Sequence, residues 1–229
     1  MENGHGQLAA EYANKPAGYF ENSRNEMLDF VPRECMSVLD VGCGEGNFGA
    51  LLKQRNSDCE VWGVELDTRS AEIAASKLDR VINQPLSADL SEFQGKRFDA
   101  VTFLDVLEHM VDPEAALRDA AQLLEPSGLV VASIPNILYF HQISEILIEQ
   151  DWRYREYGIL DNSHLRFFTK KSIIRMFENC GFRIEKIEGI SPAVGMKFRV
   201  ANLLALGRLK DWKYVQFAVV AKLSCVPTP

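Results

Sequence analysis

The sequence of 229 residues lacks several features that would assign it to a class at once. Its five cysteines form no CxxC pair and their number is odd. This spacing favours neither a zinc site nor a disulfide framework, and it suits a reducing, cytoplasmic compartment. The sequence contains no apolar run of about 18 residues, which argues against a transmembrane segment. The N-terminal stretch is polar and has no apolar signal core.

An excess of basic charge is also missing. The chain has 25 Lys and Arg against 32 Asp and Glu, which gives a formal net charge of -7. A general nucleic-acid binder usually presents a basic face. We therefore expect no nucleic-acid partner, and we turn to the pattern of apolar residues for the fold.

The first half of the chain alternates between short apolar runs and helical patterns. Runs typical of buried strands fall at 37–41, 59–66, 80–83, 98–105 and 128–135. Helical patterns lie between them at 46–55, 68–79 and 113–126. Strands that are apolar on both faces and alternate with helices predict an α/β fold with a parallel sheet covered on both sides.

The pattern changes after Pro135. We expect a helix over 136–150, a segment with no clear period over 151–169, and a helix over 170–181. Two late strands, 182–190 and 214–224, flank an insert at 191–213 that contains a helix, which suggests an antiparallel hairpin at the sheet edge.

The beginning of the chain supplies a further expected helix, over 19–31, outside the sheet. The expected organisation is thus an N-terminal helical cap over 1–35 followed by one α/β domain over 36–229. Within that domain, 136–170 and 191–213 are expected to form a lid and an insert on the side of a substrate.

The stretch LDVGCGEGNFG, residues 39–49, places a glycine-rich turn between an expected strand and helix. The spacing is Gly42-x-Gly44-x-Gly46 rather than G-x-G-x-x-G, and the turn carries Asp40 and Glu45. A pyrophosphate prefers backbone N–H groups without carboxylates nearby, so the acidic turn favours a cationic ligand. Glu65 ends the next strand, where an acid in nucleoside-binding folds accepts hydrogen bonds from ribose.

These motifs resemble class I S-adenosylmethionine-dependent methyltransferases. VLDVGCGEGNFG resembles their glycine motif, VWGVELD the motif with the ribose-binding acid, and SADL (87–90) the adenine-contacting segment. The region from FDAVTFLD to ASIPN resembles the part of that family between its fourth and fifth strands. The resemblance implies a Rossmann-like, doubly wound sheet of seven strands with the last one antiparallel, and S-adenosyl-L-methionine as cofactor.

The resemblance also implies cofactor contacts for the methionine half. Asp40, Gly42 and Gly44 would border the methionine part, and the Leu104 carbonyl would reach its ammonium group. Arg24, on the expected N-terminal helix, would lie near its carboxylate.

For the nucleoside half, Glu65 would bind the ribose and Leu66 would pack on the adenine. Asp89 would face the adenine amino group, and Leu90 would add a backbone contact. Tyr19 would close over the cofactor together with Arg24. A nicotinamide oxidoreductase shares the fold and the ribose acid, and it stays open as an alternative.

Methyl transfer to a hydroxyl needs a base, and the chain has only four histidines. His109, beyond the fourth strand, and His164, in the segment without a clear period, are the candidate catalytic residues. His141 is expected to be structural. A metal held by Glu108 and His109 is disfavoured because adjacent residues rarely point at one ion, and we expect no metal.

The acceptor side is rich in aromatic residues and arginines over 151–169, which suits a planar or sugar ring and an anionic group. This segment resembles bacterial methyltransferases of glycan pathways. We therefore expect O-methylation of a small-molecule or glycan acceptor. The insert at 191–213 is expected to be an ordinary amphipathic helix, or else to cover the acceptor, contact a lipid-linked substrate or form a homodimer face. N- or C-methylation and a catalytically silent cofactor-binding partner remain alternatives.

Overall fold

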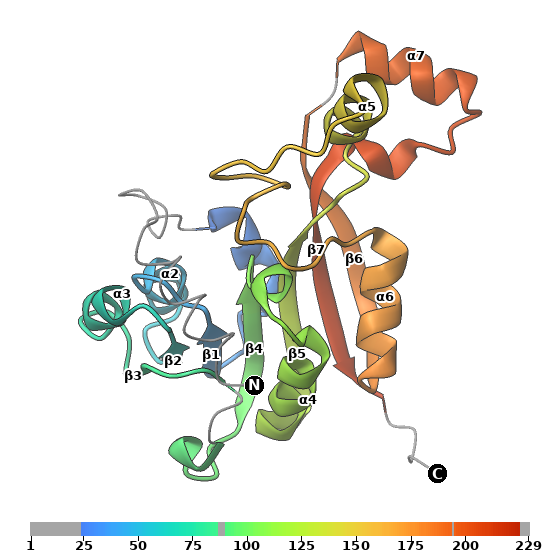
Figure 1. The fold of residues 1–229 in the computed structure, drawn as a ribbon. Helices are drawn as coiled ribbons and strands as arrows, with labels where there is room; N and C mark the ends of the chain where they lie inside the picture. Colours follow the sequence, from blue (N-terminus) through green and yellow to red (C-terminus); the bar gives the residue numbers. More distant parts are fainter. Residues whose placement is uncertain (1–23, 87–89, 194, 225–229) are drawn as a thin grey trace.

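A computed structural model of the chain describes residues 24–86, 90–193 and 195–224. Its centre is a seven-stranded sheet with the order β3-β2-β1-β4-β5-β7-β6 (Figure 1). The strands are β1 (Ser37–Val41), β2 (Glu60–Val64), β3 (Arg80–Ile82), β4 (Phe98–Leu104), β5 (Leu124–Pro135), β6 (Phe182–Pro192) and β7 (Tyr214–Leu223). The α-helices are α2 (Asn47–Arg55), α3 (Thr68–Ala74), α4 (Pro113–Leu123), α5 (Phe140–Glu149), α6 (Lys170–Asn179) and α7 (Met196–Leu204).

The first five strands pair in parallel, and β7 runs antiparallel between β5 and β6. In the register, Val131 of β5 pairs with Val220 of β7. The expected Rossmann-like sheet with an antiparallel last strand is thus confirmed. Its late hairpin is formed by β6 and β7, as the alternation of the sequence predicted.

Helices cover the sheet on both faces because the central strands are buried on both sides. One core cluster joins the sheet to α4 and α6 through side chains such as Leu117 and Phe177. The other cluster joins it to α2 and to the 3-10 helix η2 (Asn25–Phe30) through Leu52 and Met27. These two clusters give three layers, helix on sheet on helix.

The helix expected over 68–79 ends already at Ala74, and two other helix boundaries differ from the sequence predictions for identifiable reasons. The helix expected over 113–126 ends at Leu123, and β5 begins at once. Pro126 has no N–H group, and it disfavours helical geometry in the residue before it. The helix expected over 136–150 begins at Phe140, because the Asn136 side chain accepts a hydrogen bond from Leu138 N at 3.1 Å and turns the chain.

The N-terminal segment forms a shorter element than expected. Instead of a helix over 19–31, the described part has the 3-10 helix Asn25–Phe30, and residues 1–23 lie outside the described range. The division into a cap over 1–35 and a domain over 36–229 stays a prediction.

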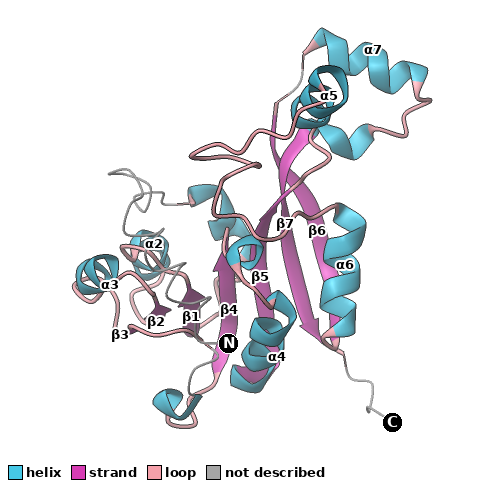
Figure 2. Cartoon of the chain, in the orientation of Figure 1, coloured by secondary structure: helices cyan, strands magenta, loops and turns pink. Residues whose placement is uncertain are grey.

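The helices α5 and α7 stand beyond the end of β6 and β7, away from the body of the sheet (Figure 1). They contact each other through Phe140 and Phe198, whose ring centroids are 5.4 Å apart. The connection from α5 to α6 is mostly loop, as Figure 2 shows, and it returns toward the sheet. No helix in the described part of the chain is long and apolar enough to cross a membrane.

The strand order reverses at β1, which has β2 on one side and β4 on the other. Connections from β1 and β4 therefore leave on opposite faces, and a crevice opens beyond the carboxyl ends of these strands. The glycine turn after β1 lies at this position, with Gly42 in a left-handed conformation at φ 70°.

We predict that Gly42→Ala lowers stability more than a control glycine substitution does. A Cβ at Gly42 would lie 2.5 Å from Cγ2 of Val106, a stiff β-branched side chain. Gly95 has φ 76° and nothing within 4 Å of such a Cβ, so Gly95→Ala reports the backbone strain alone, about 1–2 kcal/mol. Urea unfolding of both variants measures the difference, and equal losses would show that Val106 yields without cost.

Candidate functional site

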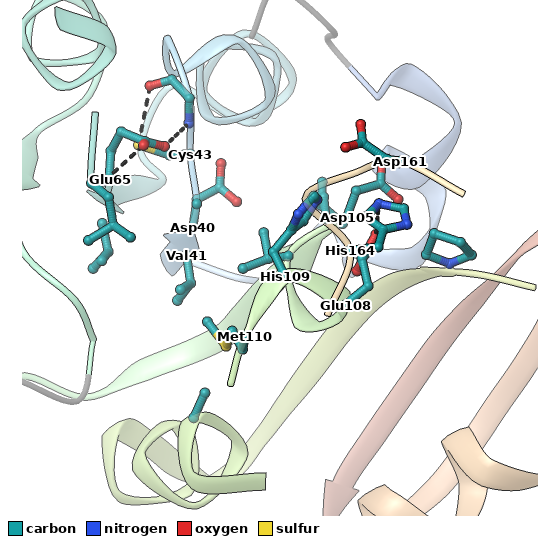
Figure 3. A pocket seen from close by; sticks show the side chains of 18 of the residues that line it. Asp40, Val41, Cys43, Glu65, Asp105, Glu108, His109, Met110, Asp161 and His164 are labelled. Atoms are coloured by element: carbon teal, nitrogen blue, oxygen red, sulfur yellow. Dashed lines mark hydrogen bonds and ion pairs between the residues drawn. The ribbon is translucent and has the colours of Figure 1, made fainter. Parts of the chain in front are cut away.

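A cavity of about 810 Å³ lies beyond the carboxyl ends of β1, β2 and β4. Ligand sites of roughly 300–1,000 Å³ hold small molecules and cofactors, so this cavity has room for a nucleoside ligand and part of an acceptor. Figure 3 shows Cys43 and Glu65 on one side, Asp40 between, and a group of polar residues on the other side, namely Asp105, Glu108, His109, Asp161 and His164.

The glycine turn is held against the end of β2 by backbone hydrogen bonds. Gly42 N and Cys43 N both donate to Val64 O, at 2.8 and 3.1 Å. Gly44 N donates to Oε2 of Glu65 at 2.8 Å. The three glycines of the turn have positive φ values of 70°, 54° and 76°, which explains their spacing. The turn thus forms a cradle at the edge of the cavity. A side chain at Gly42 would collide with Val106, which lines the same cavity.

The Glu65 carboxylate is fixed in place from three sides. Besides Gly44 N, the backbone N–H groups of Leu66 and Asp67 donate to Oε1, both at 2.8 Å. The side chain is only 7% exposed, and burial raises its pKa although the three N–H groups act in the opposite direction. A carboxylate offers about four acceptor positions, so one position remains for a ligand hydroxyl.

Asp40 places a second acid under the cradle. Its Oδ1 accepts a hydrogen bond from Thr102 Oγ1 at 2.6 Å, and its side chain is buried. Burial, together with repulsion from Glu65, raises the pKa of Asp40 to about 7, against the effect of the Thr102 hydrogen bond. A cation beside Asp40 would relieve this cost, so these residues fit a cationic nucleoside better than a pyrophosphate.

Arg24, directly before the 3-10 helix η2, lines the cavity, but it already has an acidic partner. It forms an ion pair with Asp105, and its Nη1 donates to Gln216 Oε1 at 3.2 Å. Gln216 Nε2 in turn donates to Asp105 Oδ1 at 2.7 Å. Asp105 therefore links the N-terminal segment to β7 at the mouth of the cavity.

The two candidate histidines lie together at the far side of the cavity. Their ring centroids are 4.6 Å apart, and the rings meet edge to face. Nδ1 of His109 lies 3.1 Å from Ser163 O, and Nδ1 of His164 lies 3.0 Å from Ile159 O. A carbonyl oxygen only accepts, so in both rings Nδ1 carries the proton and Nε2 has the lone pair when the ring is neutral.

Glu108 completes this side of the cavity. Its side chain is 1% exposed, and burial raises its pKa to about 8, although Arg24 partly offsets this. Its backbone oxygen accepts from Leu165 N and Arg166 N, at 2.9 and 3.0 Å. These two bonds tie the loop that carries His164 to the short helix η4 (Leu107–His109) that carries His109.

Most of the residues singled out in the sequence meet in this one cavity. Those that line it are Arg24, Asp40, Gly42, Gly44, Glu65, Leu66, Leu104, His109 and His164. Leu90 instead begins the 3-10 helix Leu90–Phe93, packs against the core and does not line the cavity. Tyr19 and Asp89 lie outside the described residues.

Four further polar residues of the cavity were missed in the sequence. They are Asp105, Asp112, Asp161 and Gln216. A signal existed for Gln216, because it is the polar exception within the apolar part of β7, Val215–Val220. Asp161 closes its own loop, since its Oδ1 accepts from Ser163 N at 2.8 Å and from Ser163 Oγ at 2.6 Å.

Comparisons with solved structures bear on the fold. A methyltransferase from Archaeoglobus fulgidus, described as SAM-dependent, superposes with a TM-score of 0.67 at 22% identity, over 90% of this chain and 96% of that one. A SAM-dependent methyltransferase from Thermotoga maritima, described as a possible histamine N-methyltransferase, gives a TM-score of 0.60 at 16% identity over 97% and 95%. These likenesses establish the Rossmann-like architecture.

Several curated sequences that resemble this chain are ubiquinone biosynthesis O-methyltransferases. The ubiquinone biosynthesis O-methyltransferase of Alkalilimnicola ehrlichii is 32% identical over 119 residues, 48% of this chain and 47% of the relative. That of Azoarcus sp. is 26% identical over 200 residues, 83% of this chain and 82% of the relative. The chain thus matches about half the length of some of these relatives and most of others.

The model of the family described as "Methyltransferase domain" matches residues 10–187. This range includes the glycine turn, Glu65, Glu108 and both buried histidines. Together with the sheet order and the acidic cradle, the match favours methyl transfer over the nicotinamide oxidoreductase that the sequence left open. The chain belongs to the methyltransferase domain family and is a class I S-adenosylmethionine-dependent methyltransferase.

Proposed function

We propose that the enzyme transfers the methyl group to a hydroxyl oxygen of a small-molecule or glycan acceptor. The observation that carries this proposal is the pair of buried histidines at the side of the cavity opposite Glu65, with Nδ1 of each ring bonded to a backbone carbonyl. A hydroxyl loses its proton during transfer, and an imidazole lone pair on Nε2 can accept it. The names of the curated relatives, which are O-methyltransferases, agree with this choice.

The cofactor-binding roles follow from the cradle. When bound, S-adenosylmethionine supplies the activated methyl group on its sulfonium. We assign the ribose hydroxyls to the fourth acceptor position of Glu65 and the cationic methionine end to the side of Asp40 and the glycine turn. Arg24 is already paired with Asp105, so we assign it to orient that end of the cofactor as part of this ion pair.

For the acceptor's proton, we propose His164 as the base and His109 as its neighbour in the same polar group. His164 Nε2 lies 4.0 Å from Glu108 Oε1, so an imidazolium formed there would have a carboxyl group close by. The alternatives of N- or C-methylation need different proton chemistry, and a silent partner protein needs none. A strong dependence of turnover on His164 therefore favours the hydroxyl acceptor.

The loop from 157 to 164 is the proposed acceptor-side lid. Tyr157, Gly158, Ile159, Asp161 and His164 line the cavity. None of the described residues of the insert at 191–213 lines the cavity. We therefore propose that the insert contacts parts of the acceptor outside the cavity or forms the interface of a homodimer. A cytoplasmic location is proposed on the sequence alone.

We expect Glu65→Gln to weaken binding of S-adenosylmethionine by about ten- to a hundredfold. The substitution removes the charge and places an amide NH₂ against backbone N–H groups that now donate to a carboxylate; hydrogen bonds to charged groups contribute about 1.5–3 kcal/mol. Isothermal titration calorimetry measures the dissociation constant. Glu72→Gln on the exposed side of α3 is the matched control. An unchanged affinity for Glu65→Gln would contradict the ribose assignment.

Cofactor affinity should rise with pH between 6 and 8. The pKa of Asp40 is about 7 in the ligand-free protein, so the carboxyl is mostly protonated at pH 6 and mostly ionised at pH 8. Because a cationic ligand favours the ionised form, affinity should increase by up to about tenfold over this range. Calorimetry at three pH values compares the wild type with Asp40→Asn, whose profile should be flatter. Parallel profiles would remove Asp40 from this role.

His164→Ala should lower turnover by about 10²–10⁴-fold while leaving cofactor affinity within a factor of about three, as expected for loss of a general base. Turnover is measured as formation of S-adenosylhomocysteine with panels of phenolic, catecholic and sugar hydroxyl acceptors and with a panel of amine acceptors. His141→Ala, an exposed histidine on α5, is the control. Wild-type turnover in His164→Ala would exclude His164 as the base, and turnover only with amine acceptors would overturn the hydroxyl proposal.

A further inference from the structure

Three potential metal ligands converge on the acceptor side of the cavity. They are the carboxylate of Glu108 and the imidazoles of His109 and His164, and one ligand atom from each lies within 4.8 Å of the others. All three side chains are buried, with exposed fractions of 1%, 6% and 8%. Figure 3 shows them on the side away from Glu65, and all three line the cavity.

The two imidazoles have the orientation that metal-ligating histidines show. Each donates its Nδ1 proton to a backbone carbonyl, His109 to Ser163 O and His164 to Ile159 O. Such a bond fixes the tautomer, so that Nε2 of the neutral ring is the nitrogen with the lone pair. The ring orientation is thus set by the backbone before any ion arrives.

The Glu108 carboxylate provides the independent observation. Both of its oxygens are buried, and neither makes a hydrogen bond to the described part of the chain. His164 Nε2 lies 4.0 Å from Oε1, which is too long for a hydrogen bond. A buried carboxylate without hydrogen bonds is costly, and such groups are normally paired or bound to a metal.

The convergence also explains why two adjacent residues can serve one site. Glu108 and His109 lie in the tight turn of η4, where His109 N donates to Val106 O at 3.0 Å. The loop with His164 is bound to the same turn, because Leu165 N and Arg166 N donate to Glu108 O. In this turn both side chains line the cavity, although the two residues are adjacent in the sequence.

We propose that Glu108, His109 and His164 form a binding site for one divalent transition-metal ion. Two imidazole nitrogens and one carboxylate oxygen suit Zn²⁺, Fe²⁺, Mn²⁺ or Co²⁺, whereas Mg²⁺ and Ca²⁺ prefer oxygen ligands. Ligand atoms around such an ion are separated by roughly 3–3.5 Å, so the three side chains draw together when it binds. The remaining coordination positions face the cavity.

An ion at this site would assist the acceptor directly. It would bind the acceptor's hydroxyl oxygen and lower the pKa of that hydroxyl, whose proton passes to solvent water. In this state the histidines act as ligands, and solvent water rather than His164 accepts the proton. This consequence rests on the proposed function, whereas the metal site itself does not.

The test is metal binding to the full chain after treatment with a chelator, without cofactor or acceptor. Co²⁺ is titrated and followed by its ligand-field absorption and by calorimetry, and Zn²⁺ then competes for the site. We expect one Co²⁺ per chain, displaced by Zn²⁺ and not by Mg²⁺. Glu108→Gln and His164→Ala should each weaken binding by at least about a hundredfold, since even outer-shell changes cost 10–100-fold.

Glu114→Gln and His141→Ala, a surface carboxyl and a surface imidazole, should bind as the wild type does. An absence of saturable binding to the wild type, or an unchanged affinity in Glu108→Gln and His164→Ala, would overturn the proposal. Circular dichroism establishes that each variant is folded. If one is not, imidazole ¹⁵N resonances of the wild type decide, because Zn²⁺ must shift Nε2 of His109 and His164 rather than of other histidines. An absence of metal binding would overturn the metal site alone. The proposal of methyl transfer to a hydroxyl is tested separately, by turnover.

Discussion

The Glu65 carboxylate ties the glycine turn to the end of β2, and the shape of the cavity depends on this contact. Its two oxygens accept backbone N–H groups from both segments, from Gly44 on one side and from Leu66 and Asp67 on the other. The turn cannot move away without exposing these donors and stranding a buried charge. The same interaction that closes the fold at this point therefore presents an oriented acid to the cofactor.

The cavity keeps two functions apart by distance. Glu65 and Asp40 lie on the cradle side, where burial makes both carboxyls reluctant to ionise and a cationic ligand is favoured. On the other side, burial also raises the pKa of Glu108, and the imidazoles of His109 and His164 lie close to it. One cavity thus has an acidic, cation-accepting half and an imidazole-rich half, and the methyl group would pass between them.

The antiparallel strand β7 contributes more than an edge to the sheet. It brings Gln216 beside Asp105, which in turn pairs with Arg24 from the N-terminal segment. Asp105 has φ 56°, a left-handed conformation that is uncommon for residues other than glycine, asparagine and aspartate. Three parts of the chain that are far apart in sequence are therefore locked together at the mouth of the cavity, next to the end of β4.

The sequence by itself determined the sheet, the glycine turn and the acid after β2. These depend on local signals: apolar runs, glycines where φ must be positive, and a fixed spacing from turn to acid. It misplaced the ends of helices at Leu123 and Phe140, because Pro126 and the Asn136 side chain act only over one turn. Only the tertiary structure decided which polar residues meet. His109 and His164 are 55 positions apart, and Glu108 joins them because backbone bonds from Leu165 and Arg166 fix their loop to its carbonyl. No periodicity encodes that contact, since it arises from the path of a loop across the sheet.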